Sequence, residues 1–376
     1  MKGLPRDSFQ KLVDAHAGDR YVKKFGCWQQ LLAMVYGHLA GVGSLRELET
    51  GFNQHRNHFY HLQALQVHRS TLADANDRRN PKVFEEAVRL LVALAGRSVR
   101  RQRAQLLYLI DSSTIALYGR GSQWARSGAT RTRGLKLHVQ FEAASQLPVH
   151  QVITAANVND ETQGSQIVAE AGATYVFDKG YCNYGWWERI ASAEARFVTR
   201  LKKNAAVQQI AQRELCAQEP EILSDTVVRF AYKSNRGGHT NACLRPLRRI
   251  EVDRPGDEPL VLITNDLRAP AAEIAQLYRQ RWGIELFFKW IKQHLKIKKF
   301  LGESENAVRI QLLTALIAYL LVALLKATDK LTASLWHILA ELRTGLFLRP
   351  QEEMSRWRRQ RQRQATLQAL QPGLFP

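Results

Sequence analysis

The sequence predicts an α/β protein in which helices flank a mixed sheet, with a helical domain before the sheet and a β-rich insertion within it. Three observations favour this fold class. Residues 1–103 carry apolar side chains mostly at helical spacing. Residues 104–202 contain three strand-like runs in succession and then alternate helix with strand, an order typical of a mixed sheet with helices on its faces. The helical period returns from residue 269 onward.

The composition is that of a folded protein with a polyanionic partner. Its 376 residues are 45% hydrophobic and 23% charged, which excludes disordered, collagen-like and disulfide-scaffold proteins. The 54 Lys+Arg residues outnumber the 34 Asp+Glu residues, so the formal net charge is +20 and the pI is about 10.1. A charge this positive points most often to nucleic acid and less often to an anionic membrane.

Neither a zinc module nor a disulfide framework is predicted, because the four cysteines are far apart and form no C-x-x-C pair. A reducing cytosol fits this usage, and the charged start of the chain lacks the apolar run of a signal peptide. The most membrane-like stretch, residues 310–325, contains Gln311 and Thr314 and is shorter than the roughly 20 residues of a membrane span. We expect a buried core helix there, no membrane partner and a cytoplasmic location.

The N-terminal part, residues 1–103, is predicted to be helical. Residues 28–40 have apolar side chains at helical spacing, and glycines at 41 and 43 end that pattern. Ser44 and Glu47 then form a capping box that begins a second helix. With 17 Lys+Arg and 9 Asp+Glu, this part carries a charge of +8. Two interpretations stay open: a DNA-binding module, such as a helix-turn-helix, or a solvated helical bundle.

The middle of the chain changes to the period of strands. The continuous apolar run at residues 106–110 is typical of a buried strand, which we expect to end at Asp111. Strands are predicted over residues 106–110, 135–141, 149–155, 175–177 and 197–201, and helices over residues 161–171 and 186–193.

Residues 203–265 interrupt this alternation with short strand-like runs, such as 227–231 and 260–264, and with Gly-Gly and Pro-Gly turns. We expect a small β-rich insertion whose last strand returns to the main sheet. Helices are predicted over residues 269–299, 304–326 and 331–342, followed by an Arg-rich run at 356–363.

Two acidic residues, Asp111 and Asp178, follow buried strands. If the two strands are neighbours, the carboxylates face each other at an edge of the sheet where reactive groups gather. Crowded carboxylates repel each other, so one is protonated unless a cation lies between them. Hard divalent ions such as Mg²⁺ prefer such oxygen ligands. The alternative is that each Asp only caps the turn that follows it.

A polar stripe is predicted on the helix that begins near residue 269. At about 100° per residue, its four members point within about 60° of one another. They are Tyr278, Arg281, Glu285 and Lys292. The other faces of the helix are largely apolar, so we expect the stripe to line a site, although a solvated ladder of ion pairs would have the same spacing.

This stripe resembles the signature of the insertion-sequence-four family of DDE transposases, and residues 278–285 match the family's usual text closely. Residues 111–114 and 178–181 resemble the segments around the family's first and second catalytic Asp, although Gly often stands where Ser113 does. Residues 134–138 and 157–160 are similar to the text between those two. The resemblance covers about residues 105–325.

The resemblance implies a ribonuclease H-like catalytic core (104–202 and 266–326) interrupted by the β-rich insertion (203–265), and residues 1–103 also resemble the helical leader in one branch of the family. We expect this leader to be a helical, DNA-binding domain, and we expect a basic helical tail (327–376) that the resemblance does not cover. The resemblance also implies that Asp111, Asp178 and Glu285 are catalytic and hold two Mg²⁺ ions, which Mn²⁺ can replace. Such an ion pair stabilises the attacking and leaving oxygens of a phosphoryl transfer.

The residues beside these acids are expected to bind DNA. Arg281 and Lys292 would clamp phosphates and Tyr278 would hydrogen-bond one, while Trp282 would stack on a displaced base unless it packs in the core. Other basic residues either contact DNA or lie in solvent: Arg126, Arg131, Arg133, Lys289, Lys296, Lys298 and Lys299. His138 and His294 are not expected to bind metal, because no second histidine stands at ligand spacing from either.

The implied reaction is cleavage of double-stranded DNA at the terminal inverted repeats of an insertion sequence, through a hairpin intermediate, and strand transfer into target DNA. The expected partners are these DNAs and a second copy of the chain in the synaptic complex, in a bacterial cytoplasm and on the nucleoid when bound to DNA. Two alternatives stay open: a metal-dependent nuclease of the same fold without strand transfer, and a DNA-binding protein that has lost catalysis.

Overall fold

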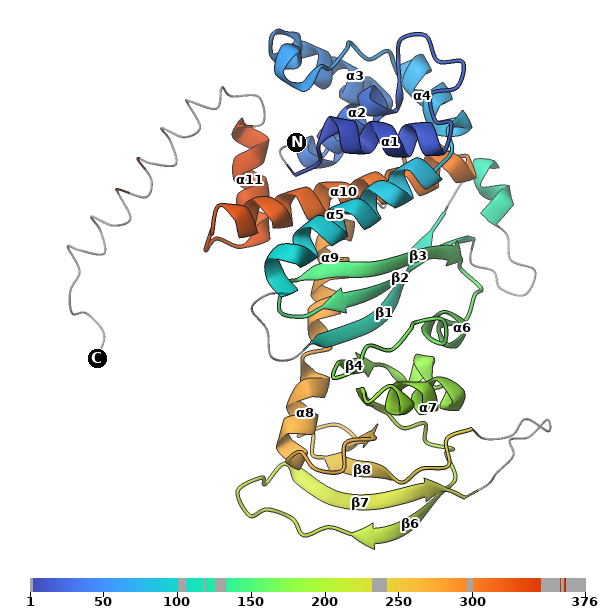
Figure 1. Ribbon diagram of the computed structural model, residues 1–376, viewed down its shortest axis with the longest axis vertical. Helices are drawn as coiled ribbons and strands as arrows, with labels where there is room; N and C mark the ends of the chain where they lie inside the picture. The colour runs from blue at the N-terminus through green and yellow to red at the C-terminus, as the bar shows by residue number, and fades with distance from the viewer. Residues whose placement is uncertain are drawn as a thin grey trace.

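A nine-stranded sheet forms the body of the molecule, with helices on both of its faces (Figure 1). The computed structural model describes residues 3–100, 106–117, 120–125, 133–231, 242–295 and 300–345, together with Arg359 and Gln362. The strand order is β3-β2-β1-β4-β5-β9-β8-β7-β6. The strands are β1 (Leu107–Ala116), β2 (Gly134–Glu142), β3 (Leu147–Ala155), β4 (Thr174–Phe177), β5 (Arg196–Arg200), β6 (Val207–Gln212), β7 (Ile222–Phe230), β8 (Leu247–Val252) and β9 (Leu260–Thr264).

The first five strands form the predicted mixed sheet. β1, β2 and β3 are antiparallel neighbours, whereas β4 pairs in parallel with β1, and β5 in parallel with β4. Parallel neighbours need a crossover connection, which α7 (Tyr184–Ser192) supplies between β4 and β5. The order 3-2-1-4-5 is that of a ribonuclease H-like sheet, so the predicted fold class is confirmed.

Strands β6 to β9 extend the same sheet rather than forming a separate one. As predicted, the last of them returns to the main sheet, where β9 pairs antiparallel with β5. Strand β8 escaped prediction because Arg248 and Arg249 interrupt its apolar pattern. Arg248 is buried, and its guanidinium donates to both carboxylate oxygens of Asp225 on β7, at 2.8 and 2.6 Å, and to the carbonyl oxygen of Ala269.

Replacing Arg248 with methionine is expected to lower the free energy of unfolding by about 3–5 kcal/mol, because the Asp225 carboxylate then stays buried without its main partner. The double replacement R248M/D225L should recover most of this loss, since no unpaired charge remains. Urea denaturation of the full chain measures both variants. No loss in the single variant would show that Arg213, 3.4 Å from the same carboxylate, neutralises it alone.

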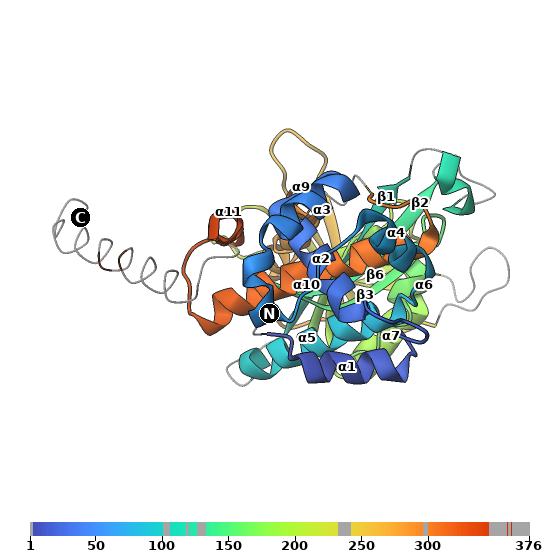
Figure 2. The same cartoon turned by 90° about the horizontal axis from the view of Figure 1, so that it is seen from above.

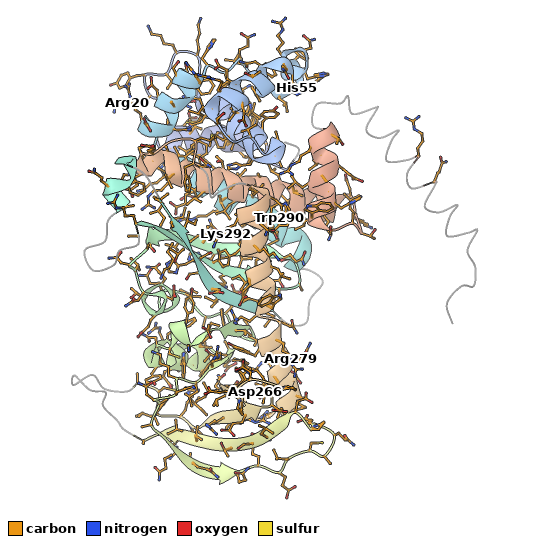
Figure 3. The ribbon with its side chains drawn as sticks, turned by 180° about the vertical axis from the view of Figure 1, so that it is seen from behind. Arg20, His55, Asp266, Arg279, Trp290 and Lys292 are labelled. Atoms are coloured by element: carbon orange, nitrogen blue, oxygen red, sulfur yellow. The ribbon has the colours of Figure 1, made fainter. Side chains whose placement is uncertain are left out.

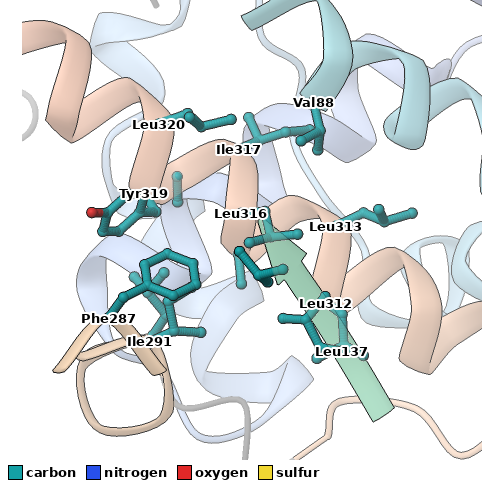
Figure 4. Packing of buried hydrophobic residues seen from close by; sticks show 14 of the residues in the cluster. Val88, Leu137, Phe287, Ile291, Leu312, Leu313, Leu316, Ile317, Tyr319 and Leu320 are labelled. Carbon is teal, nitrogen blue, oxygen red and sulfur yellow. The ribbon is translucent and has the colours of Figure 1, made fainter. Parts of the chain in front are cut away.

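Two hydrophobic layers cover the sheet. On one face, the ring centroid of Phe177 lies 4.7 Å from that of Trp186 on α7 and 6.1 Å from that of Phe197. On the other face lie α5 (Lys82–Arg100), α9 (Trp282–His294) and α10 (Glu305–Thr328). Figure 4 shows this layer, in which Leu137 of β2 packs beside Leu312 of α10. The central strands β1, β2, β4 and β5 are therefore largely buried, whereas β6 at the far edge of the sheet is mostly exposed.

Helix α10 is the buried core helix that the sequence predicts over residues 304–326. Ser304 caps its N-terminus by accepting a hydrogen bond from the backbone N–H of Ala307. Among the helices that the structure describes, it alone is long and apolar enough to cross a membrane, yet 78% of its most apolar stretch is buried inside the protein. Packing against the sheet and the N-terminal helices accounts for its composition.

The N-terminal helices form a bundle on the opposite side of α10 from the sheet (Figures 1 and 2). They are α1 (Arg6–Ala15), α2 (Cys27–Ala40), α3 (Leu45–Gln54), the 3₁₀ helix η1 (Arg56–Leu62) and α4 (Arg69–Arg78). The predicted capping box is present, because Ser44 accepts from the N–H of Glu47, while the Glu47 carboxylate accepts from the N–H of Gly43. Helix α2 is mostly buried, so it is the core of this bundle rather than an outer helix.

Several predicted elements differ in extent. The helix predicted over residues 161–171 is only α6 (Asp160–Gly164), because the chain turns at Gly164, where an added Cβ would lie 2.6 Å from the Tyr181 ring. The last helix, α11, spans Leu335–Gly345, and two 3₁₀ turns are η2 (Arg120–Ala125) and η3 (Lys179–Tyr181).

Some predicted DNA-contacting residues lie outside the described residues: Arg126, Arg131, Lys296, Lys298, Lys299 and the 356–363 run apart from Arg359 and Gln362.

Candidate active site

Asp111 and Asp178 lie side by side, where the parallel pairing of the neighbouring strands β1 and β4 ends. The parallel pairing of β1 with β4 ends at Ile110 opposite Phe177, and the two acids are the next residues on their strands. Because side chains alternate along a strand, both acids point to the sheet face on which α9 lies. One prediction is wrong in detail: β1 does not end at Asp111 but continues to Ala116, since β2 still pairs with it there.

The polar stripe spans two helices rather than the single helix predicted over residues 269–299. Helix α8 (Ala271–Arg279) ends and α9 begins on either side of a tight turn at Gln280 and Arg281. Hydrogen bonds of the i→i−3 type carry the chain through this turn, for instance from the N–H of Gly283 to the carbonyl of Gln280 at 2.9 Å. Gly283 permits the turn to approach β1, because a Cβ there would lie 3.3 Å from Leu109 Cδ1.

This turn places the side chains of the stripe in contact with Asp111 and Asp178. The Tyr278 hydroxyl donates to Asp178 Oδ1 at 3.2 Å. Arg281 donates from Nη1 to Asp111 Oδ2 at 3.3 Å and from Nη2 to Glu285 Oε1 at 2.6 Å. Five residues predicted from the sequence thus converge: three acids from two strands and a helix, with a hydroxyl and a guanidinium between them.

Lys292, labelled in Figure 3, stands two helical turns after Glu285 on α9, so it lies on the same side of the helix. Together with Asp111 and Glu285 it lines a cavity of about 330 Å³ between β1 and α9. The other lining residues are Ser112, Ser113, Phe288, Lys289 and Gln293. This opening leads from the surface to the carboxylates and carries two lysines on its wall.

Trp282 is not a core residue. Its side chain is 60% exposed, and Leu286, one turn further along α9, is 50% exposed. The core-packing alternative for Trp282 is therefore wrong, and the apolar faces of the predicted helix are not packed throughout.

Two further residues belong to this edge of the sheet and were missed. Arg200 is the last residue of β5, and its Nη1 lies 3.8 Å from Asp178 Oδ1. Its place at the end of the next parallel strand, on the same face, is a signal that could have identified it. Asp160, at the start of α6, accepts from the Ser112 hydroxyl at 2.6 Å and lies 3.3 Å from Lys136 Nζ.

Burial sets the electrostatics of the cluster. The pKa of Asp111 is raised to about 6, mainly by burial and also by the charges of Glu285 and Asp160, against the lowering effects of the Ser112 N–H and Arg281. Burial and the neighbouring Asp178 raise the pKa of the Tyr278 hydroxyl. For Arg281, burial lowers the pKa, but Tyr278, Glu285 and Asp111 outweigh it and the net pKa is raised. Arg281 is therefore the fixed positive charge of the metal-free cluster.

Replacing Asp111 with asparagine is expected to stabilise the metal-free protein at pH 7.5 by about 1–3 kcal/mol and to change little at pH 4. The pKa of Asp111 is raised from 3.8 to about 6 on folding, so between these values the folded chain holds a proton that the unfolded chain has lost. As the pH rises from 3.8 to about 6, the folded chain therefore loses free energy of unfolding relative to a variant with no carboxyl group at position 111. Thermal denaturation in chelator at both pH values measures it, and a less stable D111N at pH 7.5 would show that pairing with Arg281 outweighs burial.

The oxygen atoms of the three carboxylates suit a divalent cation, although the Arg281 guanidinium now lies between two of them and supplies the positive charge there. Asp111, Asp178 and Glu285 supply the oxygen ligands that hard cations prefer. Within the described part of the chain, no three His, Cys, Asp or Glu side chains are grouped closely enough to hold a metal ion. The Arg281 guanidinium lies between Asp111 and Glu285. If these acids hold a metal ion, Arg281 has to turn away from them.

Comparison with known proteins identifies the family. A family model described as "Transposase DDE domain" matches residues 102–321, and one described as a domain of unknown function (DUF4372) matches residues 1–63. A solved structure, the piggyBac transposase synaptic complex with hairpin DNA, aligns at a TM-score of 0.47 and 11% identity, over 98% of this chain and 82% of that chain.

Three curated relatives are assigned as transposases. A protein of Sinorhizobium fredii is 46% identical over 264 residues, which cover 69% of this chain and 72% of that protein. The protein assigned to the insertion sequence element IS5377 of Geobacillus stearothermophilus is 28% identical, over 68% of this chain and 66% of that protein. The one assigned to IS4SA of Synechocystis is 25% identical, over 68% and 71%. The chain therefore belongs to the insertion-sequence transposases with a DDE domain, which are enzymes that act on DNA and depend on a divalent metal ion.

Proposed function

We propose that this protein cleaves double-stranded DNA at the terminal inverted repeats of its own insertion sequence and joins the freed ends to target DNA. The convergence of Asp111, Asp178 and Glu285 at one edge of the sheet is the observation that supports this most. They are the acids that would hold two Mg²⁺ ions, or Mn²⁺ in their place. Bound there, the ions supply charge that stabilises the attacking and leaving oxygens of an in-line phosphoryl transfer.

The surrounding side chains bind and orient the DNA strand. When Arg281 leaves the acids, its planar guanidinium donates two hydrogen bonds to a phosphate. The Lys292 ammonium, on the cavity wall, adds a second positive charge. The Tyr278 hydroxyl donates to Asp178 in the free protein and to a phosphate in the complex. Trp282, the residue after Arg281, is exposed and stacks on a base displaced from the duplex. Arg200 holds Asp178 in place from β5.

The remaining parts of the chain have roles of their own in this proposal. Residues 1–103 bind DNA, residues 104–202 and 266–326 form the catalytic core, residues 203–265 are the insertion, and the basic tail, 327–376, contacts phosphates without reading bases. Two chains synapse two DNA ends as a homodimer. The enzyme acts in a bacterial cytoplasm and associates with the nucleoid through its DNA.

A plasmid assay tests the proposal. A donor plasmid that carries the DNA flanking the gene is incubated with purified full-length protein, a target plasmid, and either Mg²⁺ or chelator. We expect metal-dependent breaks at the repeat ends and joined donor–target products. Breaks without joined products would favour a nuclease of the same fold, and binding without breaks would favour a protein that has lost catalysis.

A further inference from the structure

We propose that residues 55–69, the segment that runs from η1 to the start of α4, form a rigid loop that docks on duplex DNA at the ends of the element. We call this segment the 55–69 loop. The proposal rests on the proposed function and goes beyond it by assigning a surface that begins in the part of the chain, residues 1–63, whose matching family model is described as having unknown function. Three features of the loop support the proposal: its positive charge, its fixed backbone and its exposed side chains.

The 55–69 loop contains basic and neutral residues and no acid. Arg56 and Arg69 stand near its two ends, and four histidines lie between or beside them: His55, His58, His61 and His68. Glu49 on α3, outside the loop, is 3.5 Å from His68 Nδ1. A surface segment of this composition attracts phosphates, which supply most of the affinity of proteins for DNA.

The backbone of the loop is held in place by side chains of the neighbouring helices. The Asn53 side chain donates to the carbonyl of Val67 at 2.8 Å and accepts from the N–H of Val67 at 2.9 Å. The Trp28 indole donates to the carbonyl of Leu62 at 3.0 Å, and Gln29 donates to that of Gln63 at 3.2 Å. Because the loop is already ordered, it loses little conformational freedom when it binds.

Two of its own apolar side chains fix the loop from below, while others point outward. Phe59 is buried, with its ring centroid 4.8 Å from that of Phe52 on α3, and Val67 is buried as well. Tyr60 is 86% exposed, and Leu65 is 45% exposed. The Tyr60 ring packs edge-on against His61, with centroids 5.6 Å apart. A rigid loop thus presents an aromatic ring with a hydroxyl between arginines, a combination that suits a DNA groove and its flanking phosphates.

Tyr21 offers a matched control. It is 88% exposed, and the guanidinium of Arg20 lies 4.9 Å from its ring centroid. Figure 3 shows Arg20 and His55 at opposite sides of the N-terminal helices, and Tyr21 follows Arg20 in the chain, so Tyr21 lies away from the 55–69 loop. Removal of either ring leaves the buried core unchanged, because both are solvent-exposed.

The test measures fluorescence anisotropy of a labelled duplex of about 30 bp from the DNA flanking the gene, with the full-length protein and with Y60A, R56A, R69A and Y21A. We expect Y60A to weaken binding about tenfold and Y21A to leave it unchanged. Each arginine variant should reduce the salt dependence, the slope of log K against log salt concentration, by about one. Unchanged affinity and slope in Y60A, R56A and R69A would overturn the proposal.

A second measurement separates this proposal from the proposed function. Single-turnover cleavage of the same DNA ends by the parent protein tests the proposed function without any loop variant. If the parent cleaves its ends and the loop variants bind as the parent does, only the loop assignment fails. If the parent binds and the loop variants bind weakly, but the parent does not cleave, the proposed function fails and the surface stands. A change of oligomeric state in Y60A without a change in DNA affinity would instead make the loop a contact between copies of the chain, and would also overturn the proposal.

Discussion

Replacing Glu285 with glutamine is expected to reduce DNA cleavage about 10³-fold or more while leaving DNA affinity within about twofold, because loss of a metal ligand removes several kcal/mol of transition-state stabilisation. The change is isosteric, and the amide oxygen of the new side chain can still accept from Arg281. DNA affinity is retained because the positive groups that contact phosphate, Arg281 and Lys292, are unchanged. Donor-plasmid cleavage and anisotropy of the labelled duplex measure the two quantities separately.

The control for this variant is Glu273→Gln, which removes an exposed acid at the start of α8, away from the cluster. It changes the net charge equally and is expected to cleave as the parent does. Calorimetric titration of both proteins with Mn²⁺ adds a measurement that does not depend on activity, and E285Q alone should lose affinity. Normal cleavage by E285Q would remove Glu285 from the proposed catalytic set.

Much of this arrangement could be predicted from local patterns. Asp111 and Asp178 each follow an apolar run typical of a buried strand, and the order of elements predicted a mixed sheet, although it left open whether those two strands are neighbours. The stripe of Tyr278, Arg281 and Glu285 followed from helical spacing alone. The turn at Gln280 does not destroy it, because both turn residues keep nearly helical dihedral angles.

What sequence patterns missed was set by contacts between distant segments. β1 extends past Asp111 because β2 pairs with it, and no local pattern records a partner strand. Strand β8 carries Arg248, whose burial is possible only because Asp225 on β7 faces it. Arg200 looks like any basic residue at the end of a strand until Asp178 is placed beside it. In each case the deciding interaction joins residues from different elements, so spacing along the chain could not show it.

Replacing Arg281 with alanine is expected to weaken DNA binding about tenfold and to reduce cleavage about 10²–10³-fold, since a bidentate phosphate contact is lost. It should also raise the pKa of Asp111 above about 6, because the guanidinium that lowers this pKa is gone while Glu285 and Asp160 still raise it. Metal binding needs the ionised carboxylate, so the onset of cleavage should move to higher pH. Cleavage measured across neutral and mildly alkaline pH at saturating DNA and metal shows the shift apart from the loss of affinity.

Arg281→Lys separates charge from geometry. Lysine keeps a positive charge near Asp111 and Glu285 but lacks the planar guanidinium that hydrogen-bonds to both, so the pH profile should stay near that of the parent while cleavage remains low.

The double variant R281A/E285Q tests the pairing of Arg281 with Glu285. With position 285 neutral, removal of Arg281 should raise the pKa of Asp111 less than it does in the single variant. If R281A cleaves with the parent's pH profile, Arg281 does not control the charge of the acids. Arg281 pairs with two of the three acids, so in the proposed mechanism the same side chain that offsets their charges has to leave them when it contacts a phosphate.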